Sequence, residues 1–125
     1  MKTKLVRVYY EGRWVTTVHP TVQKYCLIET VNKGTALEAR KFRNPAHQDI
    51  VDCDVVVATL STSRHLGSIG LAMDHFTHVL LDEAAQAMEC EAIAPLALSS
   101  ANTRVVLAGW FRYYLLIAVM YRSTR

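Results

Sequence analysis

The sequence has few cysteines and no long apolar run, and both shortages exclude classes of protein. Its three cysteines are widely spaced, so they form no pair with the spacing of a metal site and leave one unmatched in any disulfide scheme. Free thiols are typical of a reducing compartment, which predicts the cytosol or the nucleus and no disulfide partner. No apolar stretch approaches the roughly 20 residues that cross a bilayer, and no apolar signal-peptide core follows the basic N-terminus. We therefore expect no membrane segment.

Glycine is also scarce, and its five positions do not form a phosphate-binding loop. A P-loop needs Gly-x-x-x-x-Gly-Lys followed by Ser or Thr, so that backbone N–H groups and the lysine surround the phosphates. No glycine supplies this arrangement, and Lys33-Gly34-Thr35 has the right residues in the wrong order. The sequence as given therefore lacks most of the usual binding site for Mg-ATP.

The chain has 125 residues, of which 51% are hydrophobic; this is typical of one compact domain and excludes disorder of the whole chain. Its net charge of +3 is unevenly distributed. Residues 1–48 carry +6, residues 49–109 carry −6 and residues 110–125 carry +3. A basic segment of this kind either attracts nucleic-acid phosphates or forms an ordinary solvated surface, and composition leaves both readings open.

The first half of the sequence has short and mixed patterns. Leu5 to Tyr10 alternates and is rich in β-formers, which predicts a strand, and Trp14 to Val18 is expected to continue as a second short strand. Thr21 to Ile28 is ambiguous, and Asn32 to Gly34 indicates a turn. Ala36 to Phe42 is expected to form a short helix.

Three apolar, β-branched runs in the second half predict strands that are buried on both faces. They are Val55 to Leu60, His78 to Leu81, and Arg104 to Gly109. A helix is expected from Glu89 to Leu98, limited or kinked by Pro95. Buried strands separated by helical or loop crossovers predict an α/β fold with a parallel sheet.

Polar or small residues follow each of these predicted strands, at the ends where α/β sheets gather their chemistry. They are the Ser-Thr-Ser run at 61–63, the Asp-Glu pair at 82–83, and Gly109. An apolar strand that ends in Asp-Glu is typical of a Walker B motif, in which Asp82 would hold Mg²⁺ through water and Glu83 would polarise the water that attacks the γ-phosphate. The alternative is that both carboxylates begin the next helix, near the positive end of its dipole.

Residues 76–89, FTHVLLDEAAQAME, resemble motif II of the superfamily-one RNA helicases of the up-frameshift-like group. The DEAAQ string at 82–86 is similar to that of the helicase-with-zinc-finger and Moloney-virus-insertion branch. Residues 55–63 resemble the strand and loop before motif II, and residues 105–109 resemble the opening of motif III. The resemblance covers roughly residues 5–109 and implies part of a first RecA-like domain.

The resemblance implies roles for eight residues. Asp82 and Glu83 would be the catalytic pair, with Asp82 as the Mg²⁺ ligand. The residues implied to contact the nucleotide and its metal ion are Asp82, Glu83, Gln86 and Gly109. The residues implied to contact nucleic acid are Thr59, Ser61, Thr62 and Ser63. The Ser-Thr-Ser run can instead be a helix N-cap before Arg64.

The sequence departs from the family pattern in several places. Besides the missing P-loop, motif III breaks off after Gly109, where the family continues with Asp and Gln and this chain continues with Trp110-Phe111-Arg112. The second RecA-like domain and a zinc-finger cluster of cysteines and histidines are also absent from the sequence. We therefore divide the chain into a partial RecA-like domain at 1–109 and a tail at 110–125 that does not resemble the family. The tail is expected to pack as a terminal strand or helix, or else to form an exposed aromatic patch.

The remaining aromatic and histidine side chains are expected to be structural. Tyr9, Tyr10 and Trp14 have the ring chemistry to stack on bases, but we expect them to be core and strand-pairing aromatics. His75 and His78 are expected at a surface or a strand end rather than on a metal.

The sequence thus predicts an α/β protein with an incomplete RecA-like parallel sheet and flanking helices. The resemblance implies a fragment of an ATP-dependent RNA helicase core, with Mg²⁺ and ATP as cofactors of the full-length protein and RNA and a second RecA-like domain as partners. Without its P-loop the chain is expected to be inactive alone. The alternatives are a non-catalytic RNA-binding or interaction module, or a chain that does not fold stably because a partial sheet leaves edges uncovered.

Overall fold

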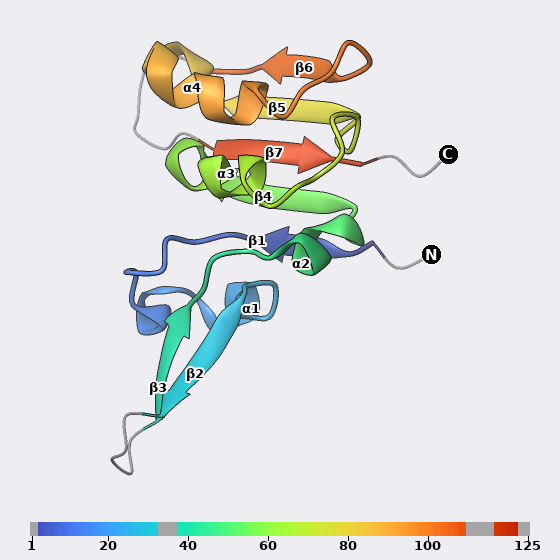
Figure 1. Ribbon diagram of the computed structural model, residues 1–125. Coiled ribbons are helices and arrows are strands. Elements are labelled where there is room, and N and C mark those ends of the chain that lie inside the picture. The colour runs from blue at the N-terminus through green and yellow to red at the C-terminus, as the bar shows by residue number, and fades with distance from the viewer. Residues whose placement is uncertain (1–2, 33–37, 110–116, 123–125) are drawn as a thin grey trace.

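The computed structural model describes residues 3–32, 38–109 and 117–122, and it shows a five-stranded sheet with a separate two-stranded hairpin (Figure 1). The strands are β1 (Leu5–Arg7), β2 (Ile28–Asn32), β3 (Glu38–Phe42), β4 (Val55–Thr59), β5 (His78–Asp82), β6 (Arg104–Leu107) and β7 (Ile117–Tyr121). The α-helices are α1 (Pro20–Gln23), α2 (His47–Val51), α3 (Leu60–Gly67) and α4 (Glu89–Leu96), and the 3-10 helices are η1 (Val15–Thr17) and η2 (Ala84–Gln86).

The five-stranded sheet has the order β1-β4-β7-β5-β6 and is mixed rather than wholly parallel. β1 pairs with β4 and β5 pairs with β6 in parallel, whereas β7 lies between β4 and β5 and is antiparallel to both. Residues 108–116 alone connect β6 to β7, and a parallel pairing needs a crossover of about a dozen residues or more. The α/β class with flanking helices is confirmed, and the tail supplies a packed terminal strand.

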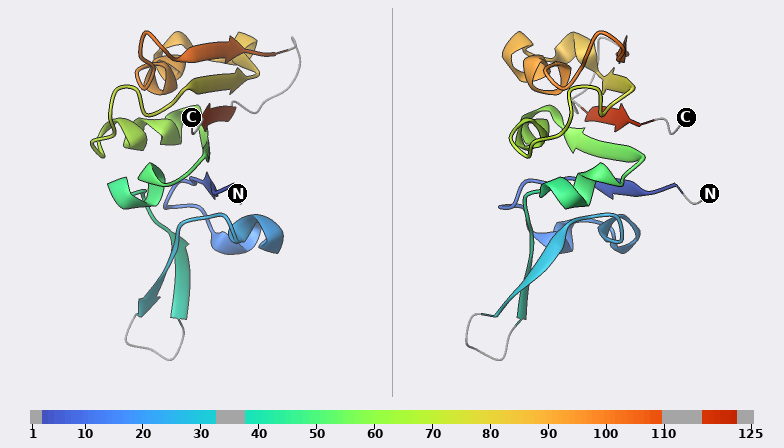
Figure 2. Two further views of the ribbon diagram at one scale, coloured as in Figure 1. Left: turned by 90° about the vertical axis from the view of Figure 1, so that its right-hand side faces the viewer. Right: turned by 45° about the vertical axis from the view of Figure 1, so that its right-hand side comes forward.

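The main core lies between the sheet and the helices on one of its faces. Figure 2 shows α2 and α3 on one side of the sheet and α1 on the other. The strand residues that point toward the main helical layer are fully or almost fully buried, and they are Val56, Ala58, Val79, Leu81, Ala118 and Met120. β6 differs from the prediction, because all four of its residues are exposed. β6 is the edge strand of the sheet and is exposed to solvent, whereas we expected it to be buried on both faces.

The first half of the chain contains two differences from the sequence-based expectations. Val15–Thr17 forms a 3-10 helix instead of a strand, and the helix expected up to Phe42 is wrong, because residues 38–42 form strand β3. Val15, Val18 and Phe42 are buried together in a small second core, and this packing overrides the helix propensity of the Ala-Leu-Glu-Ala-Arg-Lys sequence. Most of the turn expected at 32–34 lies outside the described residues.

An ion pair joins the end of the hairpin to α2. Arg43 donates from both terminal nitrogens to Asp49, at 2.6 and 2.7 Å, and the Asp49 carboxylate also accepts the backbone N–H of Ala46 at 2.8 Å. The hydrogen bond from Arg43 is the largest cause of a lowered pKa of Asp49, while burial opposes it. The pair therefore fixes the entry of the chain into α2 as long as Asp49 is ionised.

Candidate nucleotide and nucleic-acid site

The residues predicted from the motifs lie at the same end of the five-stranded sheet, where β4 and β5 finish. Thr59 ends β4, Asp82 ends β5 and Gly109 follows β6 by two residues. Ile117, the first residue of β7, pairs with both Thr59 and Asp82 and so lies between them. Two strand spacings of about 4.8 Å each place the ends of β4 and β5 about 10 Å apart. The residues predicted to bind the nucleotide and those predicted to bind nucleic acid therefore lie at the same end of the sheet but are not in contact.

The Asp-Glu pair at the end of β5 is held in an unusual backbone. Glu83 has φ 56° and ψ 32°, and among the described residues it is the one non-glycine residue with a positive φ. An L-residue in this region is strained by roughly 1–2 kcal/mol, and such residues cluster at functional sites. Asp82 is exposed, and its Oδ1 accepts the N–H of Glu83 at 3.0 Å. A short 3-10 helix follows, but the Glu83 side chain does not cap it.

Gly109 and Gln86 both lie against Glu83. A Cβ on Gly109 would lie 3.0 Å from the Ala84 nitrogen and 3.1 Å from the Glu83 Cα, so any larger residue would have to displace this backbone. The Ala84 N–H donates to the carbonyl of Ala108 at 2.7 Å and locks the two loops together. Gln86 Nε2 donates to Glu83 Oε2 at 3.2 Å. The structure therefore brings three of the four predicted nucleotide-side residues into direct contact, and Asp82 is adjacent to them.

The exposed carboxylate of Asp82 fits a magnesium ion. Mg²⁺ is usually bound by one or two carboxylates, with waters and substrate phosphates completing its shell. Within the described ranges, no three His, Cys, Asp or Glu side chains are grouped closely enough to hold a metal ion. Asp82 would therefore share the ion with water and with the phosphates of ATP.

The predicted nucleic-acid residues form the first turn of α3, where most of their hydroxyls are engaged. Thr59 is the N-cap: its Oγ1 accepts the N–H of Thr62 at 3.2 Å, and the Thr62 hydroxyl accepts the N–H of Thr59 at 3.0 Å. Ser63 is buried and donates to the carbonyl of Leu60 at 2.6 Å. Ser61 is exposed. The alternative that the Ser-Thr-Ser run is the N-cap is wrong, because Thr59 is the N-cap and residues 61–63 lie inside the first turn of α3. Ser61 is the member of the run that a phosphate can reach.

The aromatic and histidine residues differ in how far they are buried. Tyr9 packs on Phe42 with ring centroids 4.9 Å apart, as expected for a core aromatic. Tyr10 and Trp14 are not core residues, because their side chains are 62% and 77% exposed, although a β-bridge pairs Trp14 with Lys41. His75 is half-buried, and burial is the main cause of its lowered pKa.

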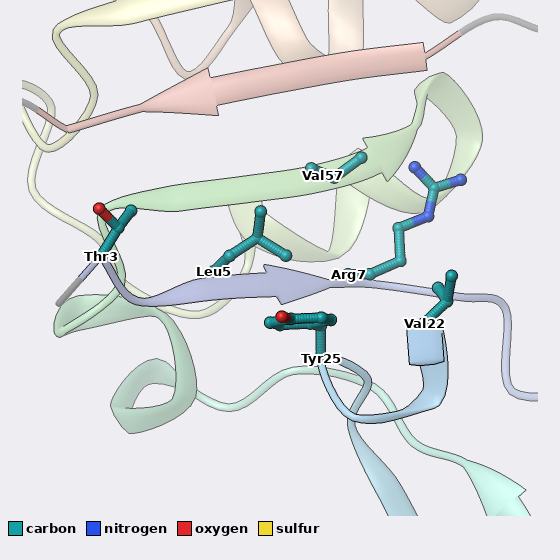
Figure 3. A pocket seen from close by; sticks show the side chains of 6 residues that line it. All are labelled: Thr3, Leu5, Arg7, Val22, Tyr25 and Val57. Carbon is teal, nitrogen blue, oxygen red and sulfur yellow. The ribbon is translucent and has the colours of Figure 1, made fainter. Parts of the chain in front are cut away.

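A groove of about 550 Å³ lies on the sheet face that α1 covers, away from the motif residues (Figure 3). Leu5, Tyr25 and Val57 give it apolar walls. Arg7 rises beside Val57 in Figure 3, and its Nε is buried without a hydrogen-bond partner. None of the predicted site residues lines this groove.

The cysteines and helices give two further findings about the chain. All three cysteines are free, and burial is the largest cause of a raised pKa of the Cys26 and Cys53 thiols. Such thiols are mostly protonated and unreactive at neutral pH. In the part of the chain that the structure describes, none of the helices has the length and apolar character needed to cross a membrane.

Comparison with known families shows which family the chain belongs to. A family model described as an AAA domain matches residues 28–110. The chain belongs to this AAA domain family. The AAA domain fold confirms the predicted partial P-loop NTPase architecture, and the family relationship confirms the resemblance to the superfamily-one helicases.

Three relatives of this AAA domain chain carry names that describe their activities. "Probable helicase with zinc finger domain" of Mus musculus is 55% identical over 104 residues, which is 83% of this chain and 5% of the relative. "RNA helicase Mov10l1" of Homo sapiens is 45% identical over 107 residues, 84% of this chain and 8% of the relative. "3'-5' exoribonuclease HELZ2" of Homo sapiens is 38% identical over 104 residues, 83% of this chain and 3% of the relative. The chain thus spans less than a tenth of each of these relatives, and no solved structure gave a significant match.

Proposed function

We propose that this AAA domain chain is a segment of the motor core of an RNA helicase, which in the whole protein couples ATP hydrolysis to the binding and unwinding of RNA. The observation that carries the proposal is the strained Asp82-Glu83 turn packed against Gly109 at the carboxyl edge of the sheet. Strain of this kind persists only where the surroundings fix it, and it is common where chemistry is done. The name of the human relative Mov10l1, an RNA helicase, supports the same class of substrate.

The residues at this edge have separate roles in the proposal. Mg²⁺, when bound with ATP, would supply charge neutralisation at the phosphates. Asp82 would hold the ion, and Glu83 would polarise the attacking water. Gln86 holds the Glu83 carboxylate through its 3.2 Å hydrogen bond, and Gly109 lets the motif III loop approach. Ser61 at the start of α3 contacts an RNA phosphate.

The missing P-loop gives this proposal a sharp test on the chain itself. Most of the phosphate contacts for ATP would come from a loop that the sequence does not contain, so we expect no ATP turnover that depends on Glu83. The measurement is phosphate release with and without single-stranded RNA, for the chain and for Glu83→Gln. Robust RNA-stimulated turnover that Glu83→Gln abolishes would contradict the role assigned to the missing loop.

A second candidate function is a non-catalytic RNA-binding module in a reducing compartment, the cytosol or the nucleus. The observation in its favour is the charge of +6 over residues 1–48, all of which precede the motif residues 55–63, 76–89 and 105–109. Such a module would bind RNA with an affinity that falls as salt rises, without any nucleotide. Fluorescence anisotropy with labelled RNA tests this candidate: binding by the chain that falls as salt rises supports the module, and no binding at low salt would contradict it.

A further inference from the structure

We propose that a groove between η1 and the β2-β3 hairpin binds one unstacked base of single-stranded RNA, with the adjoining phosphates on arginine side chains. The groove, here called the Trp14 groove, is lined by Glu11, Gly12, Arg13, Trp14, Val31, Ala39, Arg40 and Lys41. This inference rests on the proposed function, because it takes RNA as the ligand. It adds a contact that none of the helicase motif residues makes.

The wall of the groove is a tryptophan that the fold places in water. Trp14 is 77% exposed, although a large aromatic side chain gains more than most residues from burial. Its backbone is nevertheless fixed, because its carbonyl accepts the N–H of Thr17 at 3.1 Å and the Thr17 hydroxyl at 2.7 Å. An isolated β-bridge also joins Trp14 to Lys41. The backbone that carries the indole is therefore fixed while the surface of the ring stays open to a stacking partner.

The floor and size of the groove suit a single base. Val31 and Ala39 are cross-strand partners in the hairpin, and together they give the groove an apolar floor. Its volume is about 310 Å³, which is at the lower end of the roughly 300–1,000 Å³ range of small-molecule sites. A planar ring fits between such a floor and an aromatic wall, whereas a folded partner helix needs a longer groove.

Three of the four charged residues that line the groove are basic, and the fourth, Glu11, accepts a hydrogen bond from Asn44 at 3.3 Å. Arg13 is held by its 3.2 Å hydrogen bond to Thr17, and its guanidinium carbon lies 4.7 Å from the centre of the Tyr9 ring. Arg40 is exposed, and its side chain makes no hydrogen bond or ion pair with the described parts of the chain. Lys41 is paired with Glu29 at 3.0 Å. Two arginines therefore line the groove beside Trp14, one held by Thr17 and Tyr9 and one with a free side chain.

This combination favours nucleic acid over the other ligands of aromatic grooves. Single-stranded nucleic acid is bound by aromatic side chains that stack on bases together with cations that follow the backbone. A proline-rich peptide also uses aromatic-lined grooves, but it carries no phosphates for the two arginines. The hairpin projects from the β1 side of the sheet, far from β5, so the groove is separate from the Asp82 edge (Figure 1).

Tryptophan fluorescence tests the proposal directly. The sequence has two tryptophans, so Trp110→Phe leaves Trp14 as the sole source of tryptophan fluorescence. A single-stranded uridine decamer is titrated into this variant, and binding of the labelled decamer is measured in parallel by anisotropy. We expect saturable quenching of Trp14 at the same RNA concentration that saturates the anisotropy. In the unaltered chain, Trp14→Ala should weaken binding about fivefold or more, because base–aromatic stacking is lost.

Matched variants separate stacking from simple charge and from misfolding. Trp14→Phe should retain most of the affinity that Trp14→Ala loses. Arg40→Ala should weaken binding and lower the slope of log affinity against log salt by about one, as the loss of a single phosphate contact does. Lys24→Ala removes an exposed charge of the same basic segment outside the groove and should have a smaller effect than Arg40→Ala. Circular dichroism of each variant checks the fold.

The two measurements distinguish failure of this inference from failure of the proposed function. RNA that binds by anisotropy but leaves Trp14 emission and the Trp14→Ala affinity unchanged would overturn the Trp14 groove alone. RNA that does not bind at all would overturn the groove together with RNA binding by this chain. Quenching by a polyproline decamer without quenching by RNA would overturn the groove as a nucleotide site and assign it to a peptide.

Discussion

At the scale of single residues, Glu83 shows most clearly how the site departs from ordinary folding preferences. Its backbone lies in the left-handed region that glycine prefers, immediately after an otherwise regular strand. Glycine would satisfy this backbone without strain but would remove the carboxylate. Glu83 therefore makes the fold less stable than glycine would, at the position where the proposed chemistry needs an acid.

We predict that Glu83→Gly unfolds at a higher urea concentration than Glu83→Ala. Both variants lose the hydrogen bond to Gln86, but only alanine keeps the steric strain of a positive φ. The difference in free energy of unfolding should be about 1 kcal/mol in favour of glycine. Equal stability of the two variants would show that Glu83 does not hold this backbone in solution.

A second prediction concerns the Arg43–Asp49 ion pair and pH. The pKa of Asp49 lies below its ordinary value of 3.8, so its contribution to stability is present above that value and is lost as pH falls through the lowered pKa. Asp49→Asn should lower the free energy of unfolding at pH 7 by about 1–3 kcal/mol. It should also flatten the loss of stability below about pH 4, measured by urea unfolding across pH. An unchanged acid limb in Asp49→Asn would contradict this assignment.

Residue types alone predicted part of the site. The Asp-Glu pair and Gly109 were expected at strand ends because the apolar runs before them are unambiguous. The exposure of Trp14 could not be predicted, because composition does not say which aromatic side chains a small core has room for. Val15, Val18 and Phe42 fill the second core, and Trp14 is left outside it.

At the scale of elements, the sequence separated strands from helices well only where the apolar runs were continuous. β4 and β5 were predicted from continuous apolar runs, although the expectation of burial on both faces is wrong for β5, in which buried and exposed residues alternate. β3 was not, because Ala, Leu, Glu, Arg and Lys all favour helix and its strand state depends on pairing with β2 and packing of Phe42. Local pattern is thus reliable for the parallel pairs and fails for the hairpin, where tertiary contacts decide.

The loop contact between β6 and η2 gives a prediction with a matched glycine pair. Gly109→Ala should destabilise the chain by about 1–3 kcal/mol, because the new Cβ meets backbone rather than a movable side chain. Gly67→Ala, at the end of α3, meets nothing within 4 Å and should be neutral or stabilising by about 0.5–1 kcal/mol. Urea unfolding of both variants measures the difference. A tolerant Gly109→Ala would contradict the close approach of motif III to Glu83.

At the scale of the whole molecule, the tail joins the two halves of the sheet. β7 pairs with β4 on one side and β5 on the other, and Ala118 and Met120 are fully buried. The sequence predicted a packed tail but not its central position, because the order of strands in a sheet depends on long-range pairing. The stretch that does not resemble the family is therefore essential to the core of this chain.

Two methionines test this role of the tail. Met120→Ala should lower the free energy of unfolding by about 2–5 kcal/mol, as expected for a large side chain removed from a closed core. Met73→Ala makes the same chemical change at a residue that is 75% exposed, and its effect should stay within about 0.5 kcal/mol. Equal effects in urea unfolding would contradict the placement of β7. A cooperative transition in the unaltered chain would also exclude the alternative that it does not fold stably.

The central proposal is that Asp82 and Glu83 act as the hydrolytic residues of the ATP site of an RNA helicase motor core. The most direct test replaces the matching segment of human RNA helicase Mov10l1 with that of this chain and measures RNA-stimulated ATP hydrolysis. We predict that the chimera hydrolyses ATP and that Glu83→Gln lowers its turnover about 100-fold or more while RNA binding persists. Glu89→Gln, at an exposed residue in the first turn of α4, should leave turnover unchanged. A chimera that binds RNA but never hydrolyses ATP, or one that Glu83→Gln leaves fully active, would contradict the claim.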